Sequence, residues 1–183
     1  MKKWHLDHLE NLVKGIINEF NYLKPKVKKD DSIYAVALTT DEDVMTAFLS
    51  LSSKNAYLEN CNEYGYWSER WSSAEWGVAV GRDVVNGGIS ELYLADMYLY
   101  YNEYILPKLS VFNEYTEERN DFVELYTEAL KLAKASLVKQ FGDEISLAIF
   151  FLDVPGEPNI AIQSAKKINA PSILLDEMIQ DIG

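Results

Sequence analysis

The sequence predicts an α+β fold, in which helices pack against a mainly antiparallel sheet within a single domain. Segments whose apolar residues are spaced by three and four alternate with a few short segments whose apolar residues recur every second position. The first two strand-like segments are joined by a short polar loop, which favours a hairpin. We therefore expect residues 1–183 to form one domain with a well-ordered core.

The first half of the chain contains one predicted helix and two predicted strands. Residues 4–22 carry the apolar stripe of an amphipathic helix. The lysine-rich residues 24–29 are expected to form a solvated connector. Residues 32–39 and 45–51 have the two-residue period of strands, and residues 40–43 between them have the length of a hairpin loop. The sequence therefore predicts an antiparallel pair at the start of the sheet.

The second half of the chain is mostly helical by the same criterion. Residues 90–106 have helical spacing, and so, most clearly, do residues 117–141, which Gly142 follows as a left-handed cap. Residues 145–152 are short and almost wholly apolar, so we expect a strand in the middle of the sheet that is buried on both faces. Residues 159–168 are ambiguous between strand and helix, and the C-terminal end is amphipathic.

The net charge of −12 arises almost entirely in the middle of the chain, where residues 41–126 hold five basic and sixteen acidic residues. The negative electrostatic field of this region repels phosphate backbones and anionic membrane surfaces and attracts basic partners. We therefore expect a basic protein partner and expect neither nucleic acid nor a membrane to bind. The alternative is that the acidity serves only solubility.

No residue pattern predicts a catalytic, metal or cofactor site. His5 and His8 are the only histidines and lie three residues apart on one helix, so both could bind one metal ion. The only cysteine, Cys61, is distant in the sequence, so the further ligands that a metal site needs are missing from the pattern. The glycines of residues 77–88 match neither a P-loop nor a dinucleotide fingerprint. The N-terminus lacks a secretion signal and no apolar stretch approaches the roughly twenty residues of a membrane span, so we expect a cytoplasmic protein.

The most distinctive stretch is residues 64–76, where five aromatic rings fall within thirteen residues. Burial of such rings stabilises a core, but Trp, Tyr and Arg also concentrate binding energy at interfaces, and both interpretations stay open. Together with the acidic loop after the first strand, this stretch supplies the candidate partner-binding residues. They are Asp41, Glu42, Asp43, Tyr66, Trp67, Glu69, Arg70, Trp71 and Glu75.

Three segments resemble the uncharacterised bacterial family called domain of unknown function 4303. They are residues 33–43, the Trp71–Trp76 motif and residues 164–171, and the resemblance extends over nearly the whole chain. The tryptophan motif is its most specific part. The chain departs from the family in having Ala170 before the proline and in its tyrosine-rich residues 93–104. The resemblance implies no established activity, but such proteins are similar in size and acidity to immunity proteins that neutralise polymorphic toxins, including the Smi1/Knr4-like group.

The sequence thus favours a non-catalytic cytoplasmic binding protein. The more specific hypothesis is an immunity protein that neutralises a basic, nuclease-like toxin through an acidic and aromatic surface. The alternative is a carbohydrate-active or other hydrolase, in which Glu69 and Glu75 would act as paired carboxylates beside tryptophan rings. A third interpretation is a module that serves only in assembly.

Overall fold

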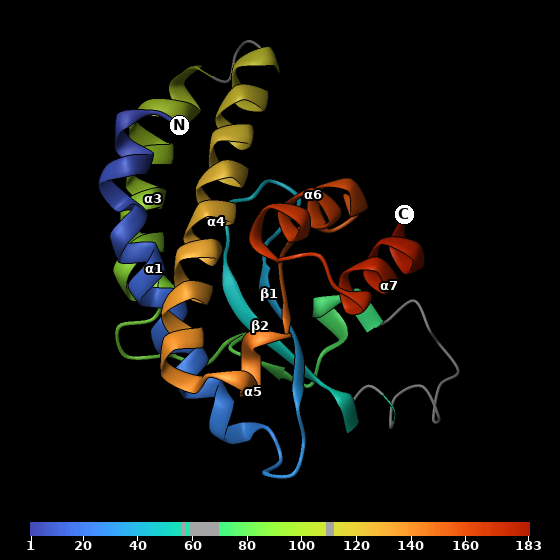
Figure 1. The fold of residues 1–183 in the computed structure, drawn as a ribbon. Coiled ribbons are helices and arrows are strands. Elements are labelled where there is room, and N and C mark those ends of the chain that lie inside the picture. Colours follow the sequence, from blue (N-terminus) through green and yellow to red (C-terminus); the bar gives the residue numbers. More distant parts are fainter. Residues whose placement is uncertain (56–57, 59–69, 109–111) are drawn as a thin grey trace.

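The computed structural model describes residues 1–55, 58, 70–108 and 112–183, and Figure 1 shows their arrangement. The elements are α1 (Lys3–Leu23), η1 (Lys24–Lys26), β1 (Ile33–Thr39), β2 (Phe48–Ser53), η3 (Ser73–Glu75), β3 (Val78–Ala79), η4 (Ser90–Leu94), α3 (Ala95–Tyr100), η5 (Tyr101–Ile105), η6 (Leu106–Lys108), α4 (Phe112–Phe141), α5 (Asp143–Ser146), β4 (Ile149–Asp153), α6 (Pro158–Ile168) and α7 (Ile173–Ile182).

The four described strands form one mixed sheet in the order β3-β2-β1-β4. β1 pairs antiparallel with β2, so that Val36 lies opposite Leu51, and β2 pairs antiparallel with β3. β1 pairs in parallel with β4, where Val36 lies opposite Phe150. The predicted α+β class and the predicted antiparallel pair are therefore confirmed, although β2 begins at Phe48 rather than at residue 45, so the connection is longer than the predicted loop. The sheet also has one parallel pair beside its two antiparallel pairs.

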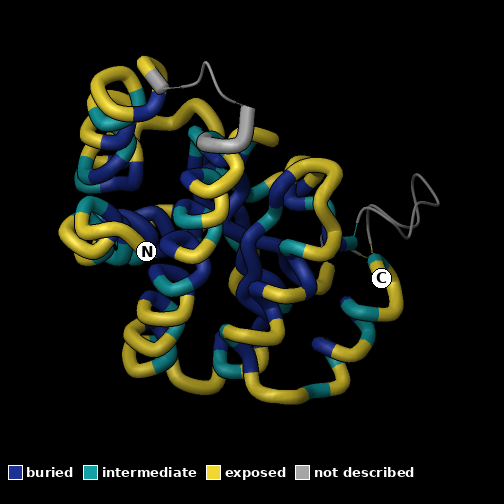
Figure 2. Tube along the Cα trace, turned by 90° about the horizontal axis from the view of Figure 1, so that it is seen from above, coloured by how far each residue is buried: buried dark blue, intermediate teal, exposed yellow. Residues whose placement is uncertain are grey.

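The sheet is the middle layer of three (Figure 1). α1, α4 and the helical segment from η4 to η5 cover one face, and α6 and α7 cover the other. Alternate residues of each inner strand enter different cores: Val36 and Phe150 face the larger core, whereas Ala37 and Phe151 face the smaller one. Figure 2 shows the dark-blue buried segments lying between the exposed outer turns of the helices.

The prediction that residues 145–152 form a central strand is wrong, because β4 lies at an edge of the sheet. The first of these residues instead form the short helix α5, and the strand itself is Ile149–Asp153. β4 is still buried because α4 and α6 pack on its two faces, which explains why its sequence resembles that of a central strand. Side chains from the end of α6 bind its outer edge.

The long predicted helices are confirmed and their ends have local causes. α1 and α4 contain the predicted residues 4–22 and 117–141. Gly142 donates its N–H to the carbonyl of Val138 at 2.8 Å and has a φ of 59°, which favours glycine, but its ψ of −130° lies outside the left-handed helical region, so the predicted left-handed cap is wrong. The ambiguous residues 159–168 are helical in α6, which has Pro158 in its first turn.

The predicted helix at residues 90–106 forms with an uneven pitch, because η4 and η5 are π-helical and α3 lies between them. Its start lies tightly against α1. A side chain at Gly15 would come within 2.9 Å of the backbone of Ile89, so this crossing requires a glycine. The contact fixes where η4 begins relative to α1.

Candidate functional site

The carboxyl ends of β1 and β4 bring together the segments that the sequence singled out. Because these two strands are parallel, the loops that follow them lie at the same end of the sheet, beyond the carboxyl ends of the strands. The N–H of Thr40 donates to the carbonyl of Asp153 at 3.0 Å and joins the two loops. The described part of the Trp71–Trp76 motif contacts the same strand ends through Ser73. We call this region the carboxyl-end surface, formed by residues 40–46, 70–76 and 153–158.

Ser73 ties the tryptophan motif to both strands. Its N–H donates to Oδ2 of Asp153 at 2.9 Å, and its hydroxyl also bonds that oxygen. The same hydroxyl lies 2.6 Å from Oγ1 of Thr39, which in turn lies 3.0 Å from Oγ of Ser50. This buried network fixes the short helix η3 on the sheet. Residues 72–75 have the spacing of a capping box, but the side chain of Ser72 makes no capping bond.

Trp71 and Trp76 are core residues. Their side chains are 3% and 8% exposed, and both rings pack edge-on against Phe151, with centroid distances of 6.3 and 5.9 Å. The indole N–H of Trp71 donates to Asp181 of α7 at 2.8 Å. The sequence left open whether the aromatic cluster is part of the core or of an interface. These two rings are part of the core.

Arg70 also reaches α7. Its guanidinium lies 2.7 Å from the carboxylate of Glu177 and 3.5 Å from that of Asp181, and it stands 4.9 Å from the centre of the Trp71 ring. Two adjacent residues that were predicted to bind a partner therefore hold the C-terminal helix against the smaller core. Glu75, the last described member of this stretch among the candidates, is exposed.

In the acidic loop after β1, hydrogen bonds hold the backbone, and two of the three carboxylates are exposed to solvent. Oδ1 of Asp41 accepts the N–H groups of Met45 and Thr46 at 2.7 and 3.4 Å, so this carboxylate shapes the turn. The side chains of Glu42 and Asp43 are exposed instead. Their carbonyl oxygens are held from α4, the first by the guanidinium of Arg119 at 3.0 Å and the second by the hydroxyl of Tyr115.

Three of the candidate residues, Tyr66, Trp67 and Glu69, lie outside the described residues. The hydrolase alternative requires a particular distance between the carboxylates of Glu69 and Glu75. Because Glu69 lies outside the described residues, this alternative stays a prediction. The structure brings Asp41, Glu42 and Asp43 to the same end of the sheet as the segment that begins at Arg70 and includes the Trp71–Trp76 motif.

Two tyrosines of α4 bond the backbone of residues 43 and 44, and two tyrosines of the tyrosine-rich segment act on their pKa values. Burial, together with the charge of Asp43 and the phenol of Tyr101, raises the pKa of Tyr115. Tyr126 donates its hydroxyl to the carbonyl of Val44 at 3.3 Å, and the phenol of Tyr98 contributes to its raised pKa, whose main cause is burial. Residues 93–104 stood out in the sequence as tyrosine-rich, but their periodicity indicated only a helix.

A cavity of about 220 Å³ lies within the carboxyl-end surface. It is lined by Thr39, Trp71, Ser72, Ala74, Asp153, Val154, Pro155, Gly156, Glu157, Pro158, Ala161 and Ile182. Its carboxylates already have partners, because Asp153 is bound by Ser73 and Glu157 lies 3.3 Å from the guanidinium of Arg119. The polar groups of this cavity therefore act chiefly in holding the two loops together.

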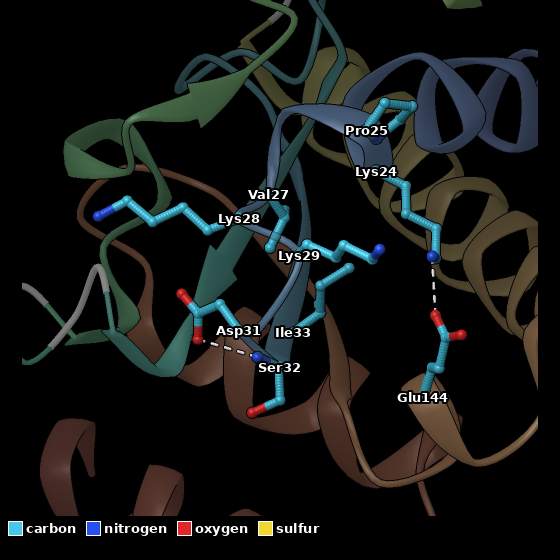
Figure 3. A pocket seen from close by; sticks show the side chains of 9 residues that line it. All are labelled: Lys24, Pro25, Val27, Lys28, Lys29, Asp31, Ser32, Ile33 and Glu144. Carbon is cyan, nitrogen blue, oxygen red and sulfur yellow. Dashed lines mark hydrogen bonds and ion pairs between the residues drawn. The ribbon is translucent and has the colours of Figure 1, made fainter.

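A second cavity, of about 600 Å³, lies at the opposite end of β1 (Figure 3). Three lysines line it, so the lysine-rich segment is not simply a solvated connector. The side chains of Lys24 and Glu144 point toward each other and their charged atoms are 2.7 Å apart, whereas Lys28 extends to the other side. Asp31 also lines the wall. Positive and negative groups nearly balance here, so the excess negative charge of the chain lies elsewhere.

The two histidines have separate surroundings. His5 is completely buried and packs against Phe122, with its Nε2 3.6 Å from the carboxylate of Glu118. His8 stacks on Trp4 at a centroid distance of 4.1 Å, and its Nδ1 lies 2.8 Å from the carbonyl of that residue. Among the described residues, no group of three or more His, Cys, Asp or Glu side chains is placed to hold a metal ion.

Comparison with known protein families matches residues 12–170 to the domain of unknown function DUF4303. The chain belongs to the DUF4303 family. The match confirms the family resemblance and contains all four described strands, together with the Trp71–Trp76 motif. No curated protein and no solved structure matches this DUF4303 chain. Within the described part of the chain, none of the helices combines the length and apolar character needed to cross a membrane.

Proposed function

We propose that this DUF4303 protein is a non-catalytic binding protein that takes up a basic protein partner on its carboxyl-end surface. The observation that carries the proposal is the acidic loop, in which Glu42 and Asp43 expose their carboxylates while Arg119 and Tyr115 hold the backbone beneath them. A loop that is already ordered loses little conformational entropy when a partner binds. Exposed carboxylates on such a loop would also speed the approach of a basic protein.

Exposed carboxylates on neighbouring segments support the same surface. Glu75 lies on η3, which Ser73 bonds to Thr39 at the end of β1, and Glu157 follows β4 and remains partly exposed beside Arg119. Charges of one sign on one surface set the orientation of an approaching partner and exclude partners of like charge.

The aromatic part of the interface is assigned to tyrosines rather than to the buried Trp71 and Trp76. Tyr98 is 43% exposed, and its phenol contributes to the raised pKa of Tyr126, whose hydroxyl bonds the carbonyl of Val44 directly after the acidic loop. Tyrosine gives a large contact area at a low cost in side-chain entropy, which suits an anchor beside a charged rim.

The finer form of the proposal is an immunity protein of the cytoplasm whose partner is a basic toxin, for example a nuclease. A nuclease needs positive charge to hold a phosphate backbone. An acidic protein that covers this charge would compete with the nucleic acid for the same surface, so neutralisation would require no chemistry from the DUF4303 chain.

The proposal is tested by capture of the partner on immobilised protein. The wild type and two double variants are incubated with a lysate of the organism that carries the gene, and bound proteins are identified by mass spectrometry. Glu42→Lys with Asp43→Lys reverses the acidic loop, while Asp7→Lys with Glu10→Lys makes the same charge change on the exposed side of α1. We expect a basic protein on the wild type and on the α1 variant, released by salt and absent from the loop variant. Capture that is equal on all three would refute the proposal.

A further inference from the structure

A third cavity, of about 540 Å³, begins next to the acidic loop. Residues 46–48 continue from that loop and form one wall, residues 80–85 form another, and η4 and α1 complete it. The full lining consists of Glu19, Thr46, Ala47, Phe48, Val80, Gly81, Arg82, Asp83, Val84, Val85, Ser90, Glu91 and Leu94. This volume lies within the range of sites that bind small molecules, so it has room for a long side chain of a partner.

The cavity combines apolar walls with one deeply buried carboxylate. Phe48, Val85 and Leu94 contribute aliphatic or aromatic surface. Glu19 is only 2% exposed, and its two oxygens accept the N–H groups of Leu49 at 2.8 Å and Ile89 at 2.9 Å. A carboxylate offers about four acceptor positions, so two remain after these bonds. A buried carboxylate also favours a cation as its further partner, since its charge is poorly solvated.

The other charged groups at the cavity are mostly acidic. Glu91 lies on the first turn of η4 and accepts the N–H of Gly87 at 2.8 Å. Asp83 binds the ammonium of Lys26 at 2.9 Å and the hydroxyl of Tyr22 at 3.0 Å. Arg82 is the one basic residue in the lining and its side chain is exposed. The lining therefore presents three carboxylates and one guanidinium. One of the carboxylates, that of Asp83, is already paired with the ammonium of Lys26.

We propose that this cavity receives one long cationic side chain, a lysine or an arginine, of the basic partner. The inference rests on the proposed function and names the group by which the partner would be held. The aliphatic stem of such a side chain would lie against Phe48 and Leu94 while its charged head meets Glu91 and Glu19. An acidic side chain would meet like charge, and a purely aliphatic one would leave the buried carboxylate without a cation.

The ionisation of Glu19 links this binding to pH. Burial raises the pKa of Glu19 to about 7, although its two backbone hydrogen bonds act in the opposite direction. A cation in the cavity would lower that pKa, so binding would release a proton and tighten as the pH rises through neutrality. The other charged groups around the cavity are Arg82, Asp83, Glu91 and, through Asp83, Lys26; the side chains of Asp83 and Glu91 are exposed to solvent, and Asp83 is paired with Lys26.

The probes for the test are the blocked amino acids N-acetyl-arginine methylamide and N-acetyl-lysine methylamide, titrated into ¹⁵N-labelled full-length protein. N-acetyl-glutamate and N-acetyl-leucine methylamide serve as controls of opposite charge and of no charge. We expect saturable chemical-shift changes at the amides of Leu49, Ile89 and Glu91 with the cationic probes only. Binding should be several-fold tighter at pH 8 than at pH 6.

Three variants complete the experiment. Glu91→Gln removes an exposed carboxylate from the rim, and we expect it to weaken the cationic probes about tenfold. Glu19→Gln tests the buried carboxylate. If the amide spectrum of this variant is that of a folded protein, its affinity for the cationic probes should be the same at pH 6 and pH 8. Glu103→Gln, on the exposed side of η5, is the matched control and should bind like the wild type.

The outcomes separate the inference from the proposed function. No shift at these amides, an equal response to the glutamate probe, or wild-type affinity in Glu91→Gln would overturn the cavity assignment. If the basic partner is still captured in that case, the function proposed above stands without the cavity. If the cationic probes bind as expected while no basic protein is captured, the proposed function fails and the cavity remains a site for amphipathic cations.

Discussion

Asn169 occupies the open edge of β4 by bonding both backbone groups of Phe150. Its Oδ1 accepts the N–H of Phe150 at 3.0 Å, and its Nδ2 donates to the carbonyl of the same residue at 2.8 Å. One turn earlier, Oγ of Ser164 accepts the N–H of Leu152 at 2.9 Å. Two side chains from α6 and its C-cap thus take the place of a further strand, which protects an edge that would otherwise pair with another chain.

Asn169→Ala should lower the free energy of unfolding by about 2–4 kcal/mol. The change leaves the N–H and the carbonyl of Phe150 buried without partners, and it removes an acceptor of the ammonium of Lys134, which now lies 2.7 Å from Oδ1. Chemical denaturation monitored by circular dichroism measures the effect. Asn159→Ala is the matched control, because Asn159 lies on the exposed first turn of the same helix. Equal stability of the two variants would contradict this role of Asn169.

Trp71 is expected to matter for stability rather than directly for recognition. Trp71→Ala removes a buried indole from the smaller core and should cost about 3–5 kcal/mol. Trp71→Phe keeps an aromatic ring but loses the bond to Asp181, and we expect a loss of about 2 kcal/mol with α7 becoming more accessible to protease. Denaturation and limited proteolysis check both variants. An unchanged melting temperature in Trp71→Ala would return this ring to the list of candidate interface residues.

Glu19 should make the folded protein less stable as the pH rises toward neutrality. Its pKa is about 7 in the folded protein and 4.5 for an ordinary glutamate, so between these values the folded state holds a proton that the unfolded state has lost. The stability that this group contributes is therefore fully present below about pH 4.5 and is lost as the pH rises through 7. At roughly 1.4 kcal/mol per pKa unit, the change amounts to about 3 kcal/mol.

The comparison of wild type with Glu19→Gln isolates this contribution from the many other carboxylates. Unfolding free energies are measured for both proteins from pH 4.5 to pH 8, and their difference is plotted against pH. We expect the stability of the wild type relative to the variant to fall by about 3 kcal/mol across this interval. A difference that stays constant with pH would show that Glu19 titrates normally in the folded protein.

The helices and the hairpin could be predicted because their signals are local. The apolar spacing of residues 4–22 and 117–141 is set by the face that each helix buries, whereas the two-residue period of residues 32–39 follows two cores, the larger facing Val36 and the smaller facing Ala37. The position of β4 could not be predicted in the same way. Burial on both faces produces the same apolar run in an edge strand as in a central strand, and only the distant Asn169 reveals that its edge is open.

The candidate site was predicted in part. The acidic residues Asp41–Asp43 follow a predicted strand directly, so their place at its end follows from the sequence. Whether Trp71 is buried depends on α7, which lies more than a hundred residues later and supplies Asp181. The role of Glu19 was missed because a single glutamate on the apolar side of a helix carries no periodic signal, and its partners Leu49 and Ile89 are distant in sequence.

The central claim is that the exposed carboxylates of Glu42 and Asp43 bind a basic protein partner. The most direct measurement is the dissociation constant of the purified, captured partner for the Glu42→Lys, Asp43→Lys double variant, determined by titration calorimetry beside the melting temperature. We predict binding about 100-fold weaker than that of the wild type, with an unchanged melting temperature and with wild-type affinity in the Asp7→Lys, Glu10→Lys control. Unaltered affinity in the loop variant would contradict the account.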